Sequence, residues 1–353
     1  MAKVAVIKTT PETVVEDYGK LMREAGYSRH ISRDRKTILK LNLSWSLYFP
    51  ACSTEPWQLD GVLKTLKEDK YADIHAVENK TVVTNPLKGA LQNKWIPVLK
   101  KHSLEFEPLT EKKWINYEPK HEMLEILNIF PDGLSIPEMF VGSNIIHLPT
   151  VKTHGHTKMT GSMKNAFGGL ITEKRHHCHK KIHEVLVDLL QIQKEIHPGM
   201  FTVMDGTVCG NGAGPRTMIP VEKDYILASS DSVAIDAVSA KMMGFDPLKI
   251  PFIKTAHDRG LGIGDFNQID MVGEDISNVN FHFTTKKSPV VFFDQVLRTK
   301  YPIIEPLLFH TNLFMLCILG SEVYHDKVWY PLVGKKIIKK FAGSKWGKKF
   351  KEY

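Results

Sequence analysis

Short β-rich segments alternate with helical segments along most of this chain, and this alternation restricts the fold more than any other feature. Over the first hundred residues the expected strands are 3–8, 37–43 and 72–79, and the expected helices are 14–26, 54–70 and 86–102. Two parallel strands need a long crossover connection, which is usually a helix. The pattern therefore predicts an α/β fold with mostly parallel sheets and flanking helices.

A second alternating series begins at residue 144. It contains expected strands at 144–152, 200–208 and 225–231, a helix at about 182–196, and a last helix that Asp231 or Ser230 caps and Gly244 ends. A polar, aperiodic stretch within residues 105–140 marks a loose boundary between the two series. We therefore expect two α/β lobes with a cleft between them, residues 1–120 and 121–300, and an apolar, then Lys-rich, extension over 301–353.

Composition and charge exclude several classes of protein. The chain has 353 residues, 42% hydrophobic and 24% charged, which excludes a disordered or collagen-like chain. The formal net charge is +8, but residues 335–353 hold eight Lys and one Glu, so the rest of the chain is nearly neutral. A nearly neutral body gives little long-range attraction to phosphate polymers. We therefore expect no specific nucleic-acid partner.

Cysteine spacing and hydropathy bear on cofactor and location. The four cysteines are too far apart in sequence for an iron–sulfur cluster or a disulfide framework, and neither is expected: Cys52, Cys178, Cys209 and Cys317. No uncharged apolar run reaches the length of a membrane span, and the start MAKVAVIKTT lacks the apolar core of a signal peptide. These features predict a cytoplasmic protein.

A segment rich in Lys, His and Gly, KTHGHTKMTGSMKNAFGG (152–169), directly follows an expected strand. Open α/β sheets bind ligands at the carboxyl ends of their strands, so we expect this segment to form an anion-binding loop. The predicted catalytic residues are His154, His156 and Lys164. The predicted substrate-binding residues are Lys40, Asn42, Lys152, Thr160, Gly161, Asn165 and Asn211. A tight turn with solvent-facing lysines is the structural alternative.

Histidines are concentrated in the middle of the chain, where eight of the sixteen lie between His147 and His197. Four of them fall in HHCHKKIH (176–183). Because imidazole binds transition metals and transfers protons near neutral pH, the clustering indicates a divalent transition-metal site. The predicted ligands are His176, His177, His179, His183 and Asp205. A basic, solvated loop is the alternative.

Two further features predict the roles of individual acidic and amide residues. The segment MDGTVCGNGAGP (204–215) is expected to be a glycine-rich loop in which Asp205 and Asn211 orient a ligand or metal. Asp231 is interpreted as a helix cap and Asp236 as a buried structural acid.

The Lys-rich end predicts an interaction surface. Its lysines are interleaved with Ile337, Ile338, Phe341, Trp346 and Phe350, and it follows the apolar stretch 303–319. Such a segment favours peripheral contact with an anionic membrane or an acidic partner. A solvated, partly disordered end is the alternative.

Five segments in a fixed order resemble the domain of unknown function 362 family: LKLNL (39–43), NIIHLPTVKTHGHTKMTGSMKNAFGG (144–169), TVMDGTVCGNGAGP (202–215), LASSDSVAIDAVSAKMMGFDP (227–247) and GLGIGDF (260–266). The resemblance covers roughly residues 35–275 and implies a cytoplasmic protein. Many members carry a ferredoxin-like four-cysteine module, which this chain lacks, so the resemblance gives an electron-transfer role no support. The chain is remotely similar to nickel-pincer lactate racemases, a likeness that implies a cofactor-bearing Lys164 and a proton-transfer base at His154 or His156.

These observations predict an enzyme that acts on a small anionic substrate with a metal or bound cofactor. The alternatives are a non-catalytic scaffold that holds a cofactor or metal, and a redox protein that works with a separate iron–sulfur partner. The enzyme is favoured if one pocket brings together His154, Lys164, Asp205 and Asn211. The scaffold is favoured if these residues are dispersed over the surface.

Overall fold

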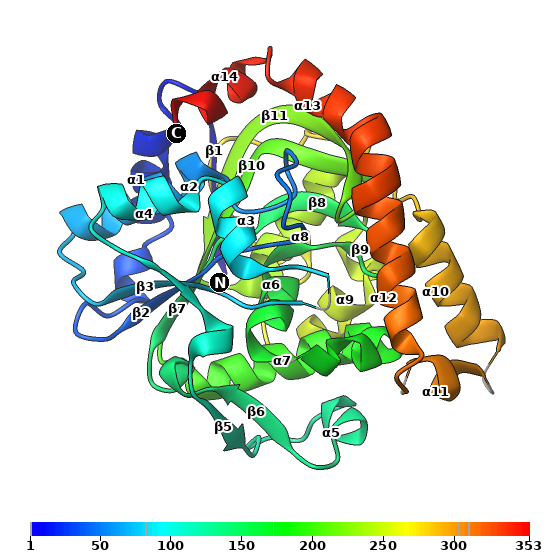
Figure 1. Cartoon of the computed structure of the whole chain (residues 1–353). Coiled ribbons are helices and arrows are strands. Elements are labelled where there is room, and N and C mark those ends of the chain that lie inside the picture. The colour runs from blue at the N-terminus through cyan, green and yellow to red at the C-terminus, as the bar shows by residue number, and fades with distance from the viewer. Residues whose placement is uncertain (1, 82, 172, 302–303, 310) are drawn as a thin grey trace.

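The computed structural model describes residues 2–353 except 82, 172, 302–303 and 310, and one large sheet forms its centre (Figure 1). The strand order is β12-β1-β11-β10-β7-β2-β3-β4, with β8 beside β10 and β9 beside β8. The strands are β1 (Lys3–Lys8), β2 (Thr37–Lys40), β3 (Ile74–Glu78), β4 (Phe106–Pro108), β7 (Asn144–His147), β8 (Thr150–His154), β9 (Lys158–Met159), β10 (Met200–Ala213), β11 (Thr217–Ser229) and β12 (Asp270–Gly273). Most neighbouring pairs are parallel; β11 is antiparallel to both β1 and β10, and β8 is antiparallel to β9.

Helices cover both faces of this sheet. One apolar core contains Val4 and Val6 of β1, and the core on the opposite face contains Ala5 and Ile7. This alternation is expected of a strand that is buried on both faces. The first core is covered by α6 (Gly161–Leu170), α7 (Ile182–Ile196), α8 (Ser232–Met243) and α9 (Pro251–Asp258), and the second by α1 (Val14–Glu24), α2 (Pro56–Glu68) and α4 (Trp95–Lys101). The predicted α/β architecture is therefore confirmed.

Local signals place several elements where the sequence predicts them. Helix α7 has the expected bounds, and Asp231 caps α8 by accepting the backbone N–H groups of Val233 and Ala234. Gly244 ends α8 in the left-handed conformation, at φ 94°. The helix expected over 86–102 is instead two helices, α3 (Pro86–Gln92) and α4, because Lys94 between them is left-handed at φ 60°.

Two expected loops are regular elements instead. The segment 204–215 lies mostly within β10, which pairs with β11 from Thr202 opposite Ser229 to Ala213 opposite Thr217. The hairpin partner satisfies the backbone of this glycine-rich segment, so it remains extended. The segment that carries Lys164 folds into helix α6 rather than into a loop.

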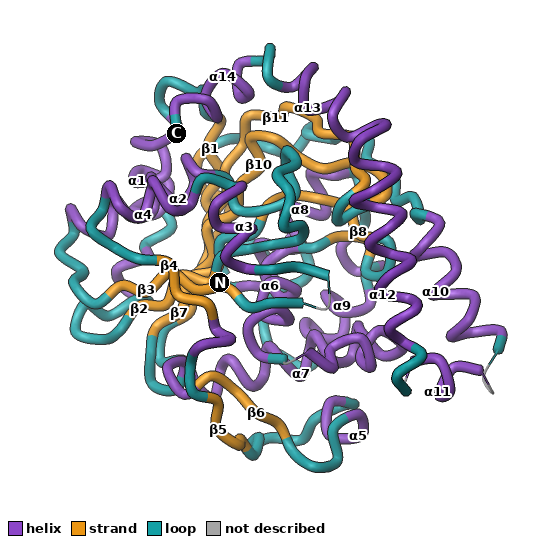
Figure 2. The backbone as a smooth tube through the Cα atoms, viewed as in Figure 1, coloured by secondary structure: helices purple, strands orange, loops and turns teal. Residues whose placement is uncertain are grey.

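The 105–140 region contains a small two-stranded sheet, β5 (Trp114–Tyr117) with β6 (Leu134–Pro137), and a short helix, α5 (Ile126–Ile129), visible at the bottom of Figure 2. The strands on either side of this region do not separate into two sheets. Instead, β1 and β2 from the first part lie in the same sheet as β7, β10 and β11. The division of the chain into two lobes stays a prediction.

The C-terminal part is a series of helices that lies along one side of the sheet and then crosses its end (orange to red in Figure 1). It consists of α10 (Pro289–Lys300), α11 (Ile304–Phe309), α12 (Phe314–Glu322), a π-helical segment (Val323–Gly334), α13 (Lys335–Phe341) and α14 (Lys345–Glu352). Trp346 is fully buried, packs on Trp57 with ring centroids 5.1 Å apart, and donates to Asp224 at 2.7 Å. The alternative of a partly disordered tail is therefore wrong. Among the described residues, no helix is both long and apolar enough to cross a membrane.

Candidate functional site

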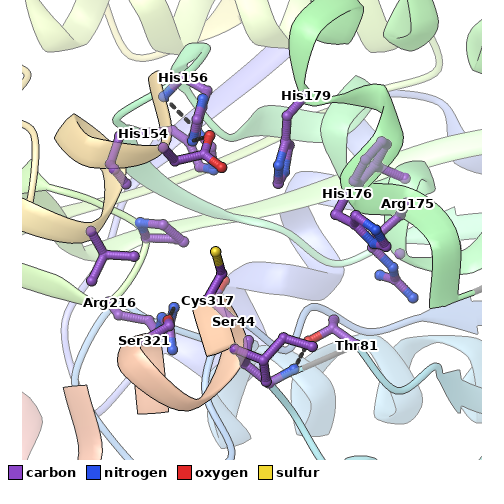
Figure 3. Close-up of a pocket in the computed structure, with 18 of the residues that line it drawn as sticks. Ser44, Thr81, His154, His156, Arg175, His176, His179, Arg216, Cys317 and Ser321 are labelled. Atoms are coloured by element: carbon purple, nitrogen blue, oxygen red, sulfur yellow. Dashed lines mark hydrogen bonds and ion pairs between the residues drawn. The ribbon is translucent and has the colours of Figure 1, made fainter. Parts of the chain in front are cut away.

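A cavity of about 540 Å³ lies at the carboxyl ends of β2, β3 and β8, against the helices α10 and α12 (Figure 3). Lys40, Glu78 and His154, which are the last residues of these three strands, all line it. Helix α6 adds Lys164 and Asn165. The position is the one where open α/β sheets bind ligands, and the volume is typical of ligand pockets, roughly 300–1,000 Å³.

Lys164 brings a positive charge into this cavity without a compensating carboxylate. Its ammonium lies 5.2 Å from the centre of the Phe167 ring, and it makes no hydrogen bond or ion pair with any described residue. Burial, together with the charges of Lys152 and Arg175, lowers the pKa of Lys164 to about 7. A bound anion would supply the missing counter-charge and restore the usual basicity of the amine.

The local backbone fixes the tautomer of His154. Its Nδ1 accepts the N–H groups of His156 at 3.1 Å and Thr157 at 3.3 Å, so the proton of the neutral ring is on Nε2. Burial and the charge of Lys164 hold the pKa of His154 well below its usual range. His154 therefore lines the cavity as a neutral ring that can donate a hydrogen bond from Nε2.

His156, His179 and Asp294 form the one group of possible metal ligands found among the described residues, with ligand atoms all within 4.8 Å of one another. The two imidazoles stack with centroids 4.9 Å apart, and His156 Nε2 lies 3.7 Å from Asp294 Oδ2. Burial lowers the pKa of His156 to about 4 and keeps that of His179 low, so both rings are neutral. Asp294 also pairs with Arg298 at 3.1 Å, so an ion would share this carboxylate with a guanidinium.

Ion pairing and amide hydrogen bonds hold the rest of the cavity wall in place. The Lys40 ammonium is buried and lies 2.8 Å from Glu78 Oε1. Asn42 donates to the side-chain oxygen of Asn165 at 3.2 Å, and Asn165 donates to the backbone oxygen of Lys40 at 3.0 Å. These three predicted residues line the cavity, but their polar atoms already have partners.

The N-terminus of α6 beside the cavity is capped by a distant residue. Asp236 accepts the N–H groups of Ser162 at 2.5 Å and Met163 at 3.0 Å. Gly161 has φ +73°, and a Cβ there would lie 2.4 Å from the Asp236 carboxylate, so only glycine permits this approach. The interpretation of Asp236 as a buried structural acid is confirmed. Because Asp236 occupies this helix end, an anion in the cavity must be bound by side chains.

Six predicted site residues do not line this cavity: Lys152, Gly161, His177, His183, Asp205 and Asn211. Asp205 is buried beneath α1 and α2, where its carboxylate accepts hydrogen bonds from Tyr18, Trp57 and Thr207. Lys152 donates to Asn42, Cys52 and Thr150, which uses all three of its N–H groups. Asn211 accepts the N–H of Thr284. Of the four residues whose convergence would favour an enzyme, the cavity brings together His154 and Lys164 only.

Among the described residues, the four histidines of the segment 176–183 do not by themselves form a group of possible metal ligands. His176 stacks on Phe314 with centroids 3.8 Å apart, and His183 stacks on Phe252 at 5.9 Å, on another side of the segment. His177 packs edge-on against His176. His179 stacks on the His156 ring, whereas His183 contacts the backbone of His156. The short 3₁₀ turns of residues 173–181 point successive side chains in different directions.

Several residues of the cavity were not predicted as site residues, among them Arg175, Arg216, Asp294 and Cys317. Arg175 lies in a basic segment that the sequence already marks. Arg216 follows the Gly-Pro turn of the β10–β11 hairpin and donates to Ser321 of α12 at 3.1 Å. No local pattern marks Asp294 or Cys317, because the helices that carry them reach the cavity from more than a hundred residues away along the chain.

Comparisons with known proteins match the part of the chain that carries the polar side of this cavity. A family model described as Domain of unknown function (DUF362) matches residues 37–241. The thylakoid-associated protein sll1697 of Synechocystis sp. (strain ATCC 27184 / PCC 6803 / Kazusa) is 30% identical over 121 residues, which cover 33% of this chain and 37% of that protein. No solved structure matches the chain. The helices α10 to α12 lie beyond the residues that the family model matches.

Proposed function

This chain belongs to the DUF362 family, and from the geometry of its cavity we propose that it is an enzyme that acts on a small anionic substrate. The observation that carries the proposal is Lys164, a cation in a cavity of ligand size with no anionic partner among the described residues. Placing an unpaired charge away from water is costly, so such a group is usually retained for a ligand.

The surrounding residues support a proton-transfer reaction. Lys164 binds the acidic group of the substrate. His154 donates its Nε2 proton to a substrate oxygen, because its Nδ1 is already an acceptor of backbone N–H groups. His156 is neutral and so is the residue that accepts a proton from the substrate. The roles of donor and acceptor are thus divided between two histidines that lie two residues apart.

A divalent transition metal is the cofactor that this site favours. His156, His179 and Asp294 would supply three protein ligands, the number typical of catalytic zinc sites, which keep a further position for water or substrate. Such an ion would stabilise negative charge that develops on the substrate. Because His156 would then be a ligand and could not accept a proton, the ion and the His156 base are alternative arrangements of this site.

Exposed apolar side chains on the C-terminal helices favour peripheral contact with an anionic membrane surface. Met315, Leu316 and Leu319 of α12 are more than half exposed, and the exposed Lys335 and Lys336 lie at the start of α13. The apolar residues of α13 and α14 cannot supply this contact, since they pack on the protein. The thylakoid-associated name of the relative agrees with a peripheral location.

The experiment that tests the enzyme proposal replaces the unpaired lysine. Lys164→Met is expected to abolish binding of inorganic phosphate and butanoate in calorimetric titrations while leaving the melting temperature nearly unchanged. Lys158→Met, an exposed lysine in the same segment, is the matched control and should bind like the wild type. Unchanged binding in Lys164→Met, or its unfolding, would show that Lys164 is structural.

Native mass spectrometry and metal analysis of the untagged wild-type protein complete the test. A retained acidic molecule that is converted on incubation supports the enzyme. A retained molecule that is never converted supports the scaffold alternative, and an iron–sulfur protein that copurifies supports the redox alternative.

A further inference from the structure

The two walls of the cavity differ in chemistry. The sheet side and α6 present the cations and imidazoles, including Lys164, Arg175 and His154. The opposite side presents apolar groups from α10 to α12, namely Val290, Val291, Leu297, Phe309, Phe314 and Ile318. In Figure 3 the labelled histidines lie across the cavity from Cys317 and Ser321 of α12. A ligand that fills this cavity therefore meets charge at one end and hydrocarbon along the other.

Helix α12 is apolar on two faces, and only one of them lines the cavity. Phe314, Cys317, Ile318 and Ser321 line it, at the spacing of three and four residues that places side chains on one helical face. Met315, Leu316 and Leu319 lie on the other face and are 63%, 64% and 57% exposed. The inner face of α12 therefore forms part of the cavity wall and is distinct from the exposed apolar face of the same helix.

The two carboxylates that line the cavity are paired with cations other than Lys164. Glu78 is paired with Lys40, and Asp294 is paired with Arg298. Lys164 is left without a counter-charge among the described residues. A small inorganic anion would satisfy Lys164 but would leave the apolar wall in contact with water, and a neutral hydrocarbon would do the reverse.

We propose that the cavity binds an amphiphilic acid, with its carboxylate or phosphate head at Lys164 and its hydrocarbon chain against the inner face of α10 and α12. The proposal rests on the proposed function and narrows its substrate class. It also assigns a function to the C-terminal helices, which lie outside the residues that the family model matches. These helices supply the apolar wall that contacts the hydrocarbon chain of the substrate.

The test measures affinity for butanoate, octanoate and dodecanoate, and for dodecyl phosphate, by calorimetry below their micellar concentrations. Affinity should rise with chain length by roughly fourfold for each methylene that is buried. Ile318→Gln, which adds no charge to the cavity, should reduce the gain in affinity from butanoate to dodecanoate. Leu316→Gln, on the outer face of the same helix, should retain the wild-type gain.

A second measurement needs no substitution in the wall. Cys317 is partly exposed in the cavity, whereas Cys52, Cys178 and Cys209 are buried, so alkylation with a maleimide should label Cys317. Dodecanoate should slow this labelling at least tenfold and butanoate should not. Cys317→Ser should remain unlabelled.

The outcomes separate this inference from the proposed function. Affinity that is independent of chain length but lost in Lys164→Met would overturn the amphiphile and leave the anionic substrate standing. Equal affinity for decanoate and 1-decanol would refute the requirement for an acidic head group on the ligand. Binding of no acid at all would overturn both.

Discussion

Two groups of polar side chains in this protein differ in whether the protein supplies their partners. The hairpin cluster, beneath α1 and α2, consists of Asp205, Tyr18, Trp57 and Thr207. The cavity cluster, at the carboxyl ends of the strands, consists of Lys164, His154, His156 and His179. Both Asp205 oxygens accept hydrogen bonds, with Tyr18 at 2.6 Å and Trp57 at 2.9 Å on one and Thr207 at 2.8 Å on the other. The Lys164 ammonium has no such partner among the described residues.

The difference shows that burial of a charged residue does not by itself mark a functional site. A buried carboxylate whose oxygens both accept hydrogen bonds has a structural role, because its removal leaves buried donors without an acceptor. A cation that lines a cavity and has no counter-charge from the protein is instead a candidate group for binding an anionic ligand. Substitution of the first kind of residue should lower the free energy of unfolding, and substitution of the second kind should weaken ligand binding.

The largest expected effect comes from breaking the hairpin cluster. Asp205→Ala should lower the free energy of unfolding by about 3–5 kcal/mol, because the Tyr18 hydroxyl and Trp57 N–H lose their acceptor in the interior. Chemical denaturation monitored by Trp fluorescence measures it. Lys164→Met, the control in the cavity cluster, should lose no stability. Equal stability losses in the two variants would refute the distinction between the clusters.

A smaller effect is expected from the metal ligands of the cavity cluster. His179→Ala and Asp294→Asn should each weaken zinc binding by roughly tenfold to a hundredfold, whereas His177→Ala should change it less than twofold. Competition with a chromophoric chelator gives these affinities. If His177→Ala has the larger effect, or if only loss of all four histidines of 176–183 matters, the histidine-rich segment binds the ion without His156 and Asp294.

The smallest expected effect is a pH dependence. In the proposed function Lys164 binds an anion when it is protonated, and burial with the nearby charges of Lys152 and Arg175 lowers its pKa to about 7. Since the free protein loses this proton as the pH rises through 7, affinity for butanoate should fall by about tenfold between pH 6 and pH 8. Butanoate itself stays ionised over this range.

The control for this profile is another cation that lines the cavity, Arg216. Arg216→Lys keeps a charged residue beside Ser321 and should retain the decline above pH 7. Affinity that is flat from pH 6 to pH 8 in the wild type would show that Lys164 does not titrate with the ligand, and would remove its role as the anion-binding group.

The sequence by itself determined the elements whose signals are local. The alternation of strands and helices, the bounds of α7, and the capping of α8 by Asp231 all depend on residues within a few positions of one another. The position of Lys164 and His154 after a parallel strand was also readable, because the carboxyl end of such a strand is where α/β sheets bind ligands.

Tertiary structure alone decided which polar residues are partnered and which are not. Asp205 is structural because Tyr18, 187 residues earlier in the chain, reaches its carboxylate. Asp294 joins His156 and His179 because α10 returns to the cavity from a distant part of the chain. The glycine-rich segment 204–215 is a strand because β11 pairs with it. Local sequence patterns do not reveal such contacts, because hydrogen-bond partners and counter-charges are neighbours in space that can be far apart in the sequence.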